Sequence, residues 1–254
     1  MALALNIGKC TLLGNYRENN EDSLDVKQFP DLTICLVADG MGGQAAGEVA
    51  SKRAIEIIPR ELRKNLNVSV ERSDETKTII RRSIVQTNDE IMAMAALDRE
   101  LKSMGTTIVA TLWRKGSSIM YVTGLGDSRV YLIRGTKIEQ LTVDHSIAQA
   151  LVEAKTITAA EAKNHRYKNV LWKYLGSAEV GEGPEVKSLP IQAGDRFLLA
   201  TDGLTGVVPD EQIASFMRSN PDAQECSDGL CQLALNQGSR DNITAIVVDV
   251  VEVK

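Results

Sequence analysis

The sequence predicts an α+β protein in which helices cover stacked β-sheets. Two long amphipathic segments come first, a block of short β-rich runs follows Gly105, and a second helical region precedes a final apolar run. The links inside the β-rich block are too short for the crossovers that parallel strands need. Helices and strands that are grouped in this way, without alternating, are typical of layered α+β folds.

The first predicted elements are a buried strand and two helices. The apolar run TICLVADG, residues 33–40, has the length of a buried strand and ends in a glycine-rich turn. Residues 45–65 and 75–101 carry apolar side chains at the three- and four-residue spacing of amphipathic helices. The segment NVSVERSDE, residues 67–75, is predicted to be a polar connection between them.

The rest of the chain is predicted to begin with short strands and to end with a long one. The short strands lie within residues 105–113, 117–126, 129–134 and 137–142. The links RKGSS and RGTK between them predict antiparallel neighbours. Residues 146–176 are expected to form helices and loops, and residues 210–236 to be mainly helical. Further strands are expected in EVKSLPI, DRFLLATDG and NITAIVVDVVEV.

Length and composition limit the class of protein. The 254 residues are 43% hydrophobic and 25% charged, without a repeat or linker, so one domain spanning residues 1–254 is expected. A net charge of −5 argues against a nucleic-acid partner. No signal peptide and no apolar run of about 20 residues is seen. The four cysteines lack zinc-site spacing. A cytoplasmic protein, taken as a monomer, is therefore predicted.

The stretch LVADGMGGQAAGEVAS, residues 36–51, places an acid before four glycines, between a predicted strand and a predicted helix. Residues 40–45 match the GxGxxA pattern of dinucleotide-binding loops. That interpretation is disfavoured because a second helix follows where a βαβ unit needs a strand, and no GK[ST] sequence is present. A metal site and a simple tight turn are the two alternatives.

Aspartates recur near the ends of the predicted strands, each beside Gly, Ser or Asn: Asp22, Asp39, Asp127, Asp202 and Asp241. One such aspartate is usually a turn former, but strand ends converge in space. Two carboxylates ~4 Å apart repel by about 4 kcal/mol at an effective dielectric near 20. A cluster of four or five carboxylates therefore needs cations or raised pKa values to persist, and all-oxygen ligands favour Mg²⁺ or Mn²⁺. Glycines after Asp39 would let the Gly40 carbonyl approach such an ion.

Seven short motifs follow one another along the chain. They are R-x-x-N-E-D at 17–22, V-A-D-G-M-G-G at 37–43, G-T-T at 105–107, G-D-S-R at 126–129, L-T-x-D-H-S at 141–146, A-T-D-G-L at 200–204 and S-R-D-N-I-T at 239–244. In this order they resemble the PP2C-type (PPM) metal-dependent protein serine/threonine phosphatases, in their compact bacterial form. The resemblance extends from about residue 8 to residue 250. Each motif alone is weak, whereas seven in sequence are specific.

The resemblance implies a central β-sandwich of two antiparallel sheets flanked by helical pairs, with two Mn²⁺ or Mg²⁺ ions at one edge. By position, Asp39 would bridge the two ions and Gly40 would offer its carbonyl. Asp202 and Asp241 would complete the ligands of one ion. Asp22 would be a ligand of the other.

The resemblance also implies supporting roles for four further residues. Glu21 would assist the metal site through water, and Asn242 would lie behind the ligands. Asp127 would hold a third, weaker metal. Arg17 would bind the substrate phosphate, because a guanidinium fork suits phosphate oxygens.

The implied reaction needs no protein nucleophile. A water that bridges two divalent ions has a lowered pKa and can attack phosphorus in line with the leaving Ser or Thr oxygen. None of the cysteines begins the C-x5-R loop of cysteine-dependent phosphatases, so a covalent route is disfavoured. The substrates would be proteins carrying phosphoserine or phosphothreonine. The chain would oppose a Ser/Thr kinase in signal transduction.

Two positions depart from the pattern of the family. Met41 stands where some relatives carry a histidine proposed as the general acid, so a metal-bound water is the candidate here. Gly206 stands where certain relatives carry another aspartate, which predicts a weak or differently built third metal site. His145 could orient water or phosphate, or could close a turn, and the turn is preferred. Residues of about 145–176 resemble the family's variable flap beside the active site.

Two other functions are weighed against the phosphatase. A non-catalytic binding module on the same fold would have lost the acidic residues, whereas all of them are present here. A phosphohydrolase of small molecules shares every motif, and only a panel of substrates separates it from a protein phosphatase.

Overall fold

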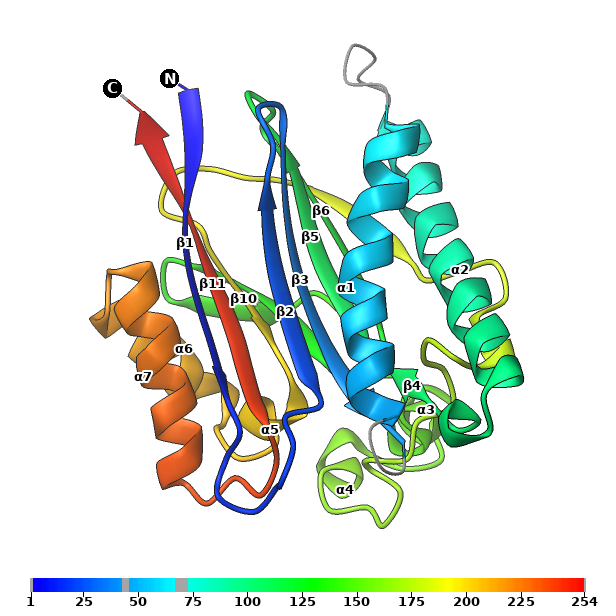
Figure 1. Ribbon diagram of the computed structural model, residues 1–254. Helices are drawn as coiled ribbons and strands as arrows, with labels where there is room; N and C mark the ends of the chain where they lie inside the picture. The colour runs from blue at the N-terminus through cyan, green and yellow to red at the C-terminus, as the bar shows by residue number, and fades with distance from the viewer. Residues whose placement is uncertain (1, 43–45, 67–72, 254) are drawn as a thin grey trace.

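Two antiparallel β-sheets are packed face to face between layers of helices in the computed structural model, which describes residues 2–42, 46–66 and 73–253 (Figure 1). The first sheet has the order β1 (Ala2–Leu12), β11 (Ile243–Val253), β10 (Arg196–Ala200), β7 (Arg129–Arg134) and β8 (Lys137–Gln140). The second has the order β2 (Asp22–Gln28), β3 (Leu32–Met41), β5 (Ile108–Arg114), β6 (Ile119–Leu125) and β9 (Val186–Pro190), and β4 (Gly105–Thr106) pairs with β3. The predicted α+β sandwich is confirmed.

Helices cover the outer face of each sheet. The second sheet is covered by α1 (Ala46–Asn65) and α2 (Ser73–Leu97), and the first by α6 (Asp210–Ser219) and α7 (Ala223–Asn236) (Figure 1). The short elements are η1 (Arg99–Leu101), α3 (Ile147–Glu153), α4 (Ala159–Ala162), η2 (Ala178–Val180) and α5 (Asp202–Thr205). This arrangement confirms the helical pairs that the resemblance implied.

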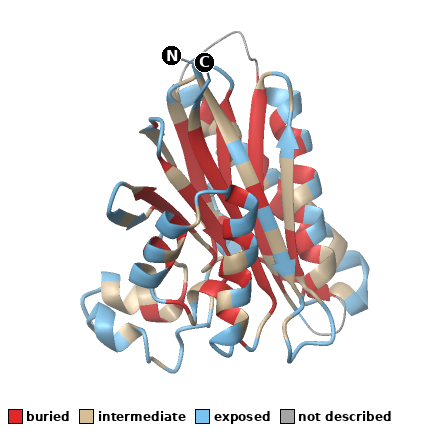
Figure 2. Cartoon of the chain, turned by 90° about the vertical axis from the view of Figure 1, so that its left-hand side faces the viewer, coloured by how far each residue is buried: buried red, intermediate tan, exposed pale blue. Residues whose placement is uncertain are grey.

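The strands in the middle of the sandwich are buried on both faces (Figure 2). In β3, Ile34 and Leu36 pack toward α1 and α2, whereas Cys35 and Val37 pack into the space between the sheets. A strand with two buried faces has a continuous apolar sequence, which explains why TICLVADG does not alternate. Helix α7 packs on the other sheet, where Leu230 contacts the cluster containing Val247.

Several predicted boundaries differ from the observed ones. The second helix ends at Leu97, four residues early, because Asp98 accepts a hydrogen bond from the Glu100 amide and starts the separate turn η1. Part of the predicted 67–75 connection, and residues 43–45 of the glycine-rich pattern, lie outside the described residues. An early strand-like stretch was expected before Asp22, but the bounds of β1 were not predicted, because it lies at a sheet edge and most of its side chains are half-exposed or exposed.

The strand registers bring all the candidate residues to one end of the sandwich. Asp22 lies directly opposite Asp39 in the pairing of β2 with β3, and Leu12 lies opposite Ile243 in the pairing of β1 with β11. The links β1–β2 and β6–β7 cross from one sheet to the other at this end. The chain ends, with Ala2 opposite Val253, lie at the other end. Crossings between sheets therefore carry Arg17 and Asp127.

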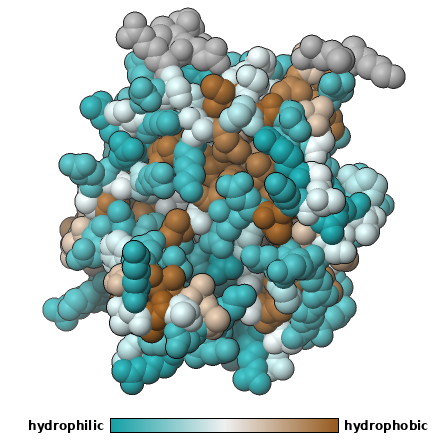
Figure 3. All heavy atoms as spheres, turned by 180° about the vertical axis from the view of Figure 1, so that it is seen from behind, coloured by the Kyte–Doolittle hydropathy of each residue, from teal (hydrophilic) through white to brown (hydrophobic). Residues whose placement is uncertain are grey.

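The surface of the described chain is mainly polar. Seen from behind, hydrophobic atoms gather above the middle of the molecule, and hydrophilic side chains cover most of its lower half (Figure 3). None of the helices within the described ranges is long and apolar enough to cross a bilayer.

Candidate active site

Five aspartates from five separate segments converge at the end of the sandwich where the sheets are linked. Asp22 begins β2, Asp39 lies near the end of β3, and Asp127 follows β6. Asp202 begins α5 directly after β10, and Asp241 precedes β11. The strand ends thus meet as the sequence predicted. Asp39 differs from the prediction in one detail, since β3 continues to Met41 by pairing with β4.

The G-T-T motif holds the backbone of Asp39. The Thr107 hydroxyl accepts a hydrogen bond from the Asp39 amide (2.9 Å), and the Thr107 amide donates to the Asp39 carbonyl (2.8 Å). The Thr106 hydroxyl donates to the same carbonyl (2.9 Å). Both threonines are buried. Three hydrogen bonds from one motif therefore fix the direction of the Asp39 side chain, a role that sequence reasoning did not assign.

The glycines after two of the aspartates are required by close backbone packing. A Cβ atom on Gly40 would lie 2.2 Å from the Gly47 carbonyl oxygen and 2.6 Å from that of Glu21. A Cβ atom on Gly203 would lie 1.9 Å from the carbonyl oxygen of Asn242. Neither glycine has a positive φ. Each D-G pair therefore lets another segment of the site approach within van der Waals contact.

Burial and mutual repulsion raise the pKa values of four of the aspartates. Burial is the largest cause for each, and it raises the pKa of Asp22 to about 7 and that of Asp127 to about 8. The pKa of Asp39 is well above its ordinary value, because the charges of the other aspartates add to burial. Burial and then the Asp241 charge raise the pKa of Asp202. Such carboxyls cannot all ionise together without nearby cations.

Arg17 supplies a positive charge at the edge of this cluster. Its Nη2 atom lies 2.7 Å from Oδ2 of Asp241, and the two side chains are 46% and 35% exposed. The hydrogen bond with Asp241 is the main cause of a raised Arg17 pKa. The guanidinium thus stays charged and faces solvent at the mouth of the site.

Asn242 joins the β1–β2 link to β11. Its Oδ1 atom accepts a hydrogen bond from the Glu21 amide (2.9 Å), and its Nδ2 atom donates to the carbonyls of Leu13 (2.8 Å) and Asn19 (3.1 Å). Asn242 is buried. All three of these partners are backbone atoms. Asn242 therefore positions the loop that carries Glu21, as expected for a residue that does not itself bind a metal.

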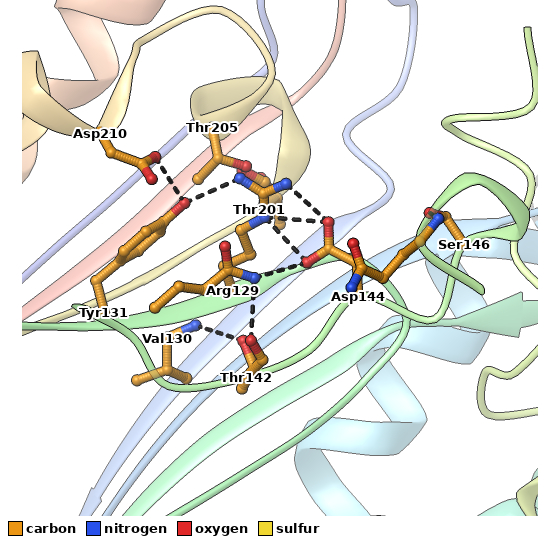
Figure 4. A network of polar contacts seen from close by, with 11 residues as sticks. Arg129, Val130, Tyr131, Thr142, Asp144, Ser146, Thr201, Thr205 and Asp210 are labelled. Atoms are coloured by element: carbon orange, nitrogen blue, oxygen red, sulfur yellow. Dashed lines mark hydrogen bonds and ion pairs between the residues drawn. The ribbon is translucent and has the colours of Figure 1, made fainter. Parts of the chain in front are cut away.

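A second network, centred on Arg129 two residues after Asp127, connects three segments of the chain (Figure 4). Arg129 binds both carboxylate oxygens of Asp144, with Nη2 2.7 Å from Oδ2, and also donates to the Tyr131 hydroxyl (3.0 Å). The Tyr131 hydroxyl donates to Asp210 at the start of α6 (3.1 Å). Sequence reasoning missed this network. The signal was present in G-D-S-R and L-T-x-D-H-S, whose Arg and Asp form the ion pair.

His145 is bound to the turn that carries Asp127. Its Nδ1 atom accepts a hydrogen bond from the Gly126 amide (3.2 Å), and its own amide donates to the Gly126 carbonyl (2.8 Å). Its carbonyl accepts from the Trp172 amide (3.0 Å), and the two rings meet edge to face at 5.5 Å. Burial lowers the His145 pKa. His145 thus links the Asp127 turn to the flap segment, defined here as residues 145–176.

A pair of substitutions tests this link. In His145→Asn, the amide oxygen replaces Nδ1 as the acceptor for Gly126, and activity should stay within about three-fold of the wild type, since the hydrogen bond is kept. In His145→Gln, the amide lies at the Nε2 position and the Gly126 amide loses its acceptor. That loss costs ~1–2 kcal/mol, so kcat/KM should fall about ten-fold. Equal losses in both variants would contradict the role of Nδ1.

The acidic cluster fits divalent cations by its chemistry. All of its donors are oxygens, and the buried Oε1 atom of Glu21 has no hydrogen-bond partner among the described residues. As the side chains stand, no three His, Cys, Asp or Glu residues of the described ranges are grouped closely enough to hold an ion. Asp241 is instead paired with Arg17, and Asp22 accepts a hydrogen bond from Thr201 (3.0 Å). Hard oxygen donors with raised pKa values fit Mg²⁺ or Mn²⁺ after side-chain rotation.

Comparison with known proteins agrees with this arrangement. The family model of protein phosphatase 2C matches residues 15–243. The serine/threonine phosphatase stp of Listeria welshimeri is 34% identical over 237 residues, which are 93% of this chain and 92% of the relative. The crystal structure of the serine/threonine phosphatase Stp1 from Staphylococcus aureus has a TM-score of 0.86 at 31% identity, covering 98% of this chain and 96% of that chain.

A further similar structure is that of the catalytic domain of PstP, a serine/threonine protein phosphatase in complex with two manganese ions. Its TM-score is 0.79 at 33% identity, and the match covers 98% of this chain and all of that chain. The order of motifs, the sandwich and the match over most of the length agree with one another. The chain therefore belongs to the protein phosphatase 2C family.

Proposed function

We propose that this chain is a metal-dependent phosphatase that hydrolyses phosphoserine and phosphothreonine in proteins. The observation that carries the proposal is the convergence of five aspartates and Arg17 at one end of the sandwich, with raised pKa values for four of the acids. The relatives that are named serine/threonine phosphatases support the substrate class.

The acids would hold two Mn²⁺ or Mg²⁺ ions, as the similar PstP structure holds two manganese ions. When bound, such ions lower the pKa of water and offset charge on the phosphoryl group. Asp39 would contact both ions, Asp22 one of them, and Asp202 and Asp241 the other. Gly40 would add its carbonyl, and Glu21 its unpartnered oxygen through water.

Arg17 would bind the phosphate of the substrate. Its side chain is 46% exposed, so it can turn from Asp241 toward an incoming anion. A guanidinium can bind two phosphate oxygens at once and thereby orients the phosphorus atom. The exchange of partners would also free Asp241 to act as a ligand.

Further assignments belong to the same proposal. Residues 1–254 would act as one catalytic domain, with the flap segment at its active-site edge. Asp127 would hold a third, weaker ion, because Gly206, four residues after Asp202, offers no carboxylate to that site. The protein would work as a cytoplasmic monomer that opposes a Ser/Thr kinase.

The test is phosphate release from a phosphothreonine peptide, first with Mn²⁺ and then with excess EDTA. Release with the metal and none with the chelator is expected. Absence of release, together with tight Mn²⁺ binding, would favour a binding module. Release from small phosphate esters but from no peptide would favour a phosphohydrolase of small molecules.

A further inference from the structure

Two loops of the active-site edge face each other through two successive pairs of residues. The link β1–β2 carries Tyr16 and Arg17, and the link α7–β11 carries Arg240 and Asp241. Arg17 contacts Asp241 through an ion pair at 2.7 Å. The Arg240 guanidinium lies over the Tyr16 ring, 5.5 Å from its centroid. The two pairs are therefore neighbours. The pair of Tyr16 and Arg240 has no role in the proposed metal site.

The second pair lies on the outer rim of the site. Tyr16 is 63% exposed and Arg240 is also exposed, whereas Asp241 is 35% exposed in its side chain. Both loops lie at the end of the sandwich opposite the chain ends (Figure 1). A group that follows the phosphate outward from Arg17 would thus meet Tyr16 and Arg240.

The contact with the Tyr16 ring leaves the hydrogen-bond donors of Arg240 available to a ligand. A cation–π contact is made through the positive charge of the guanidinium and does not occupy its N–H groups with an acceptor. Among the described residues, Arg240 makes no ion pair and the Tyr16 hydroxyl has no hydrogen-bond partner. The ring restricts the guanidinium, so less side-chain entropy is lost when it binds an anion.

We propose that Tyr16 and Arg240 form a subsite for a carboxylate side chain next to the phosphorylated residue of the substrate. This inference rests on the phosphatase function proposed above and specifies its substrate class as acidic phosphoproteins. Consecutive Cα atoms are about 3.8 Å apart, so a residue one or two positions from the phosphoresidue would reach a side chain adjacent to Arg17. A guanidinium binds a carboxylate through two parallel hydrogen bonds.

The charge of the surroundings makes Arg240 the deciding group. Glu21 and Asp241 would have their charge offset by the bound ions, and Arg17 would be engaged by the phosphate. Arg240, which lies over the Tyr16 ring, would remain as a cation that can meet a substrate carboxylate. A substrate with an acidic residue at this position would therefore gain an ion pair with Arg240 that a neutral analogue lacks. The selection acts on binding and would appear mainly in KM.

The test compares phosphothreonine peptides that differ only by Asp or Asn, placed before the phosphothreonine in one series and after it in another. The wild type with Mn²⁺ is expected to prefer the Asp peptide of one series by about three- to five-fold in kcat/KM, as for an exposed ion pair. The preference should shrink in high salt. It should fall to about one in Arg240→Ala and be reduced in Tyr16→Leu.

Arg82→Ala is the matched control, since Arg82 is an exposed arginine on α2. This variant should keep the preference. Equal use of Asp and Asn peptides by the wild type, or a preference that survives in Arg240→Ala, would overturn the subsite while leaving the phosphatase function intact. Failure to release phosphate from any peptide would overturn the function and, with it, the subsite that depends on it.

Discussion

Replacing Asp39 with asparagine is expected to abolish metal-dependent hydrolysis. The backbone of Asp39 is fixed by Thr106 and Thr107, so the new amide would stay in place but lose the negative charge that holds divalent ions. We expect kcat/KM to fall more than about 100-fold, because even residues that only support metal ligands contribute 10- to 100-fold. Phosphopeptide turnover and calorimetric titration with Mn²⁺ measure the two effects separately.

The same variant should be more stable than the wild type when no metal is present. Burial and four neighbouring acids disfavour the ionised Asp39 carboxyl, and asparagine removes that cost. In EDTA at pH 8, the melting temperature should rise by at least ~2 °C, which is about 1 kcal/mol for a chain of this size. With excess Mn²⁺ the order should reverse, because only the wild type gains strong binding energy.

Asp25→Asn is the control for these measurements. Asp25 lies in β2 three residues after Asp22, but it pairs with Lys27 and its charge is not among those that raise the pKa of Asp39. This variant should keep its activity and its response to Mn²⁺. Full activity in Asp39→Asn, or a lower melting temperature in EDTA, would show that Asp39 is not a charge-bearing member of a metal site.

The second large effect is a loss of stability with rising pH in EDTA. The folded-state pKa values of Asp22 and Asp127 are raised to about 7 and about 8, and those of Asp39 and Asp202 are also raised. In the unfolded chain these groups titrate near pH 3.9. The folded protein thus holds more protons between these values. The contribution of these four groups to the free energy of unfolding is therefore full below about pH 4 and is lost as the pH rises through 7 to 8.

Urea denaturation at pH 5, 6, 7 and 8 measures this decline. His145 acts in the opposite direction, since its lowered pKa stabilises the fold above its unfolded pKa of about 6.5. One histidine is outnumbered by four aspartates, so a net loss is expected. Excess Mn²⁺ should remove the loss, because metal replaces protons on the carboxyls. Stability that is constant or rises with pH in EDTA would contradict the raised pKa values.

The sequence predicted the position of the acids better than their partners. Asp39, Asp202 and Asp241 could be placed because each follows or precedes an apolar run whose register is set by burial. The partners depend on contacts between distant segments. The Thr107 hydroxyl that accepts a hydrogen bond from the Asp39 amide lies 68 residues away in sequence, and the Asn242 side chain that accepts from the Glu21 amide lies 221 residues away. No local pattern specifies such partners.

In the fold as well, elements with a local apolar pattern were predicted, and the bounds of an element defined by pairing with a distant strand were not. The run of β3 and the helix α1 follow from apolar periodicity, and both appear within one residue of the predicted ends. Strand β1 has few buried side chains and is identified only by its eleven-residue pairing with β11. The reason for a glycine after Asp39 and Asp202 could not be predicted from the sequence, because the atoms that approach Gly40 and Gly203 belong to other segments of the chain.

The pairing of the first strand with the last one has a consequence for biosynthesis. Arg17 and Asp241 are 224 residues apart in sequence, and β1 finds its partner only when β11 has been made. Such high contact order slows folding, because a long loop must close before its contacts form. A chain still emerging from the ribosome therefore has its early acids but no assembled site. The site can be complete only after residues 241–253 have been made and β11 can pair with β1.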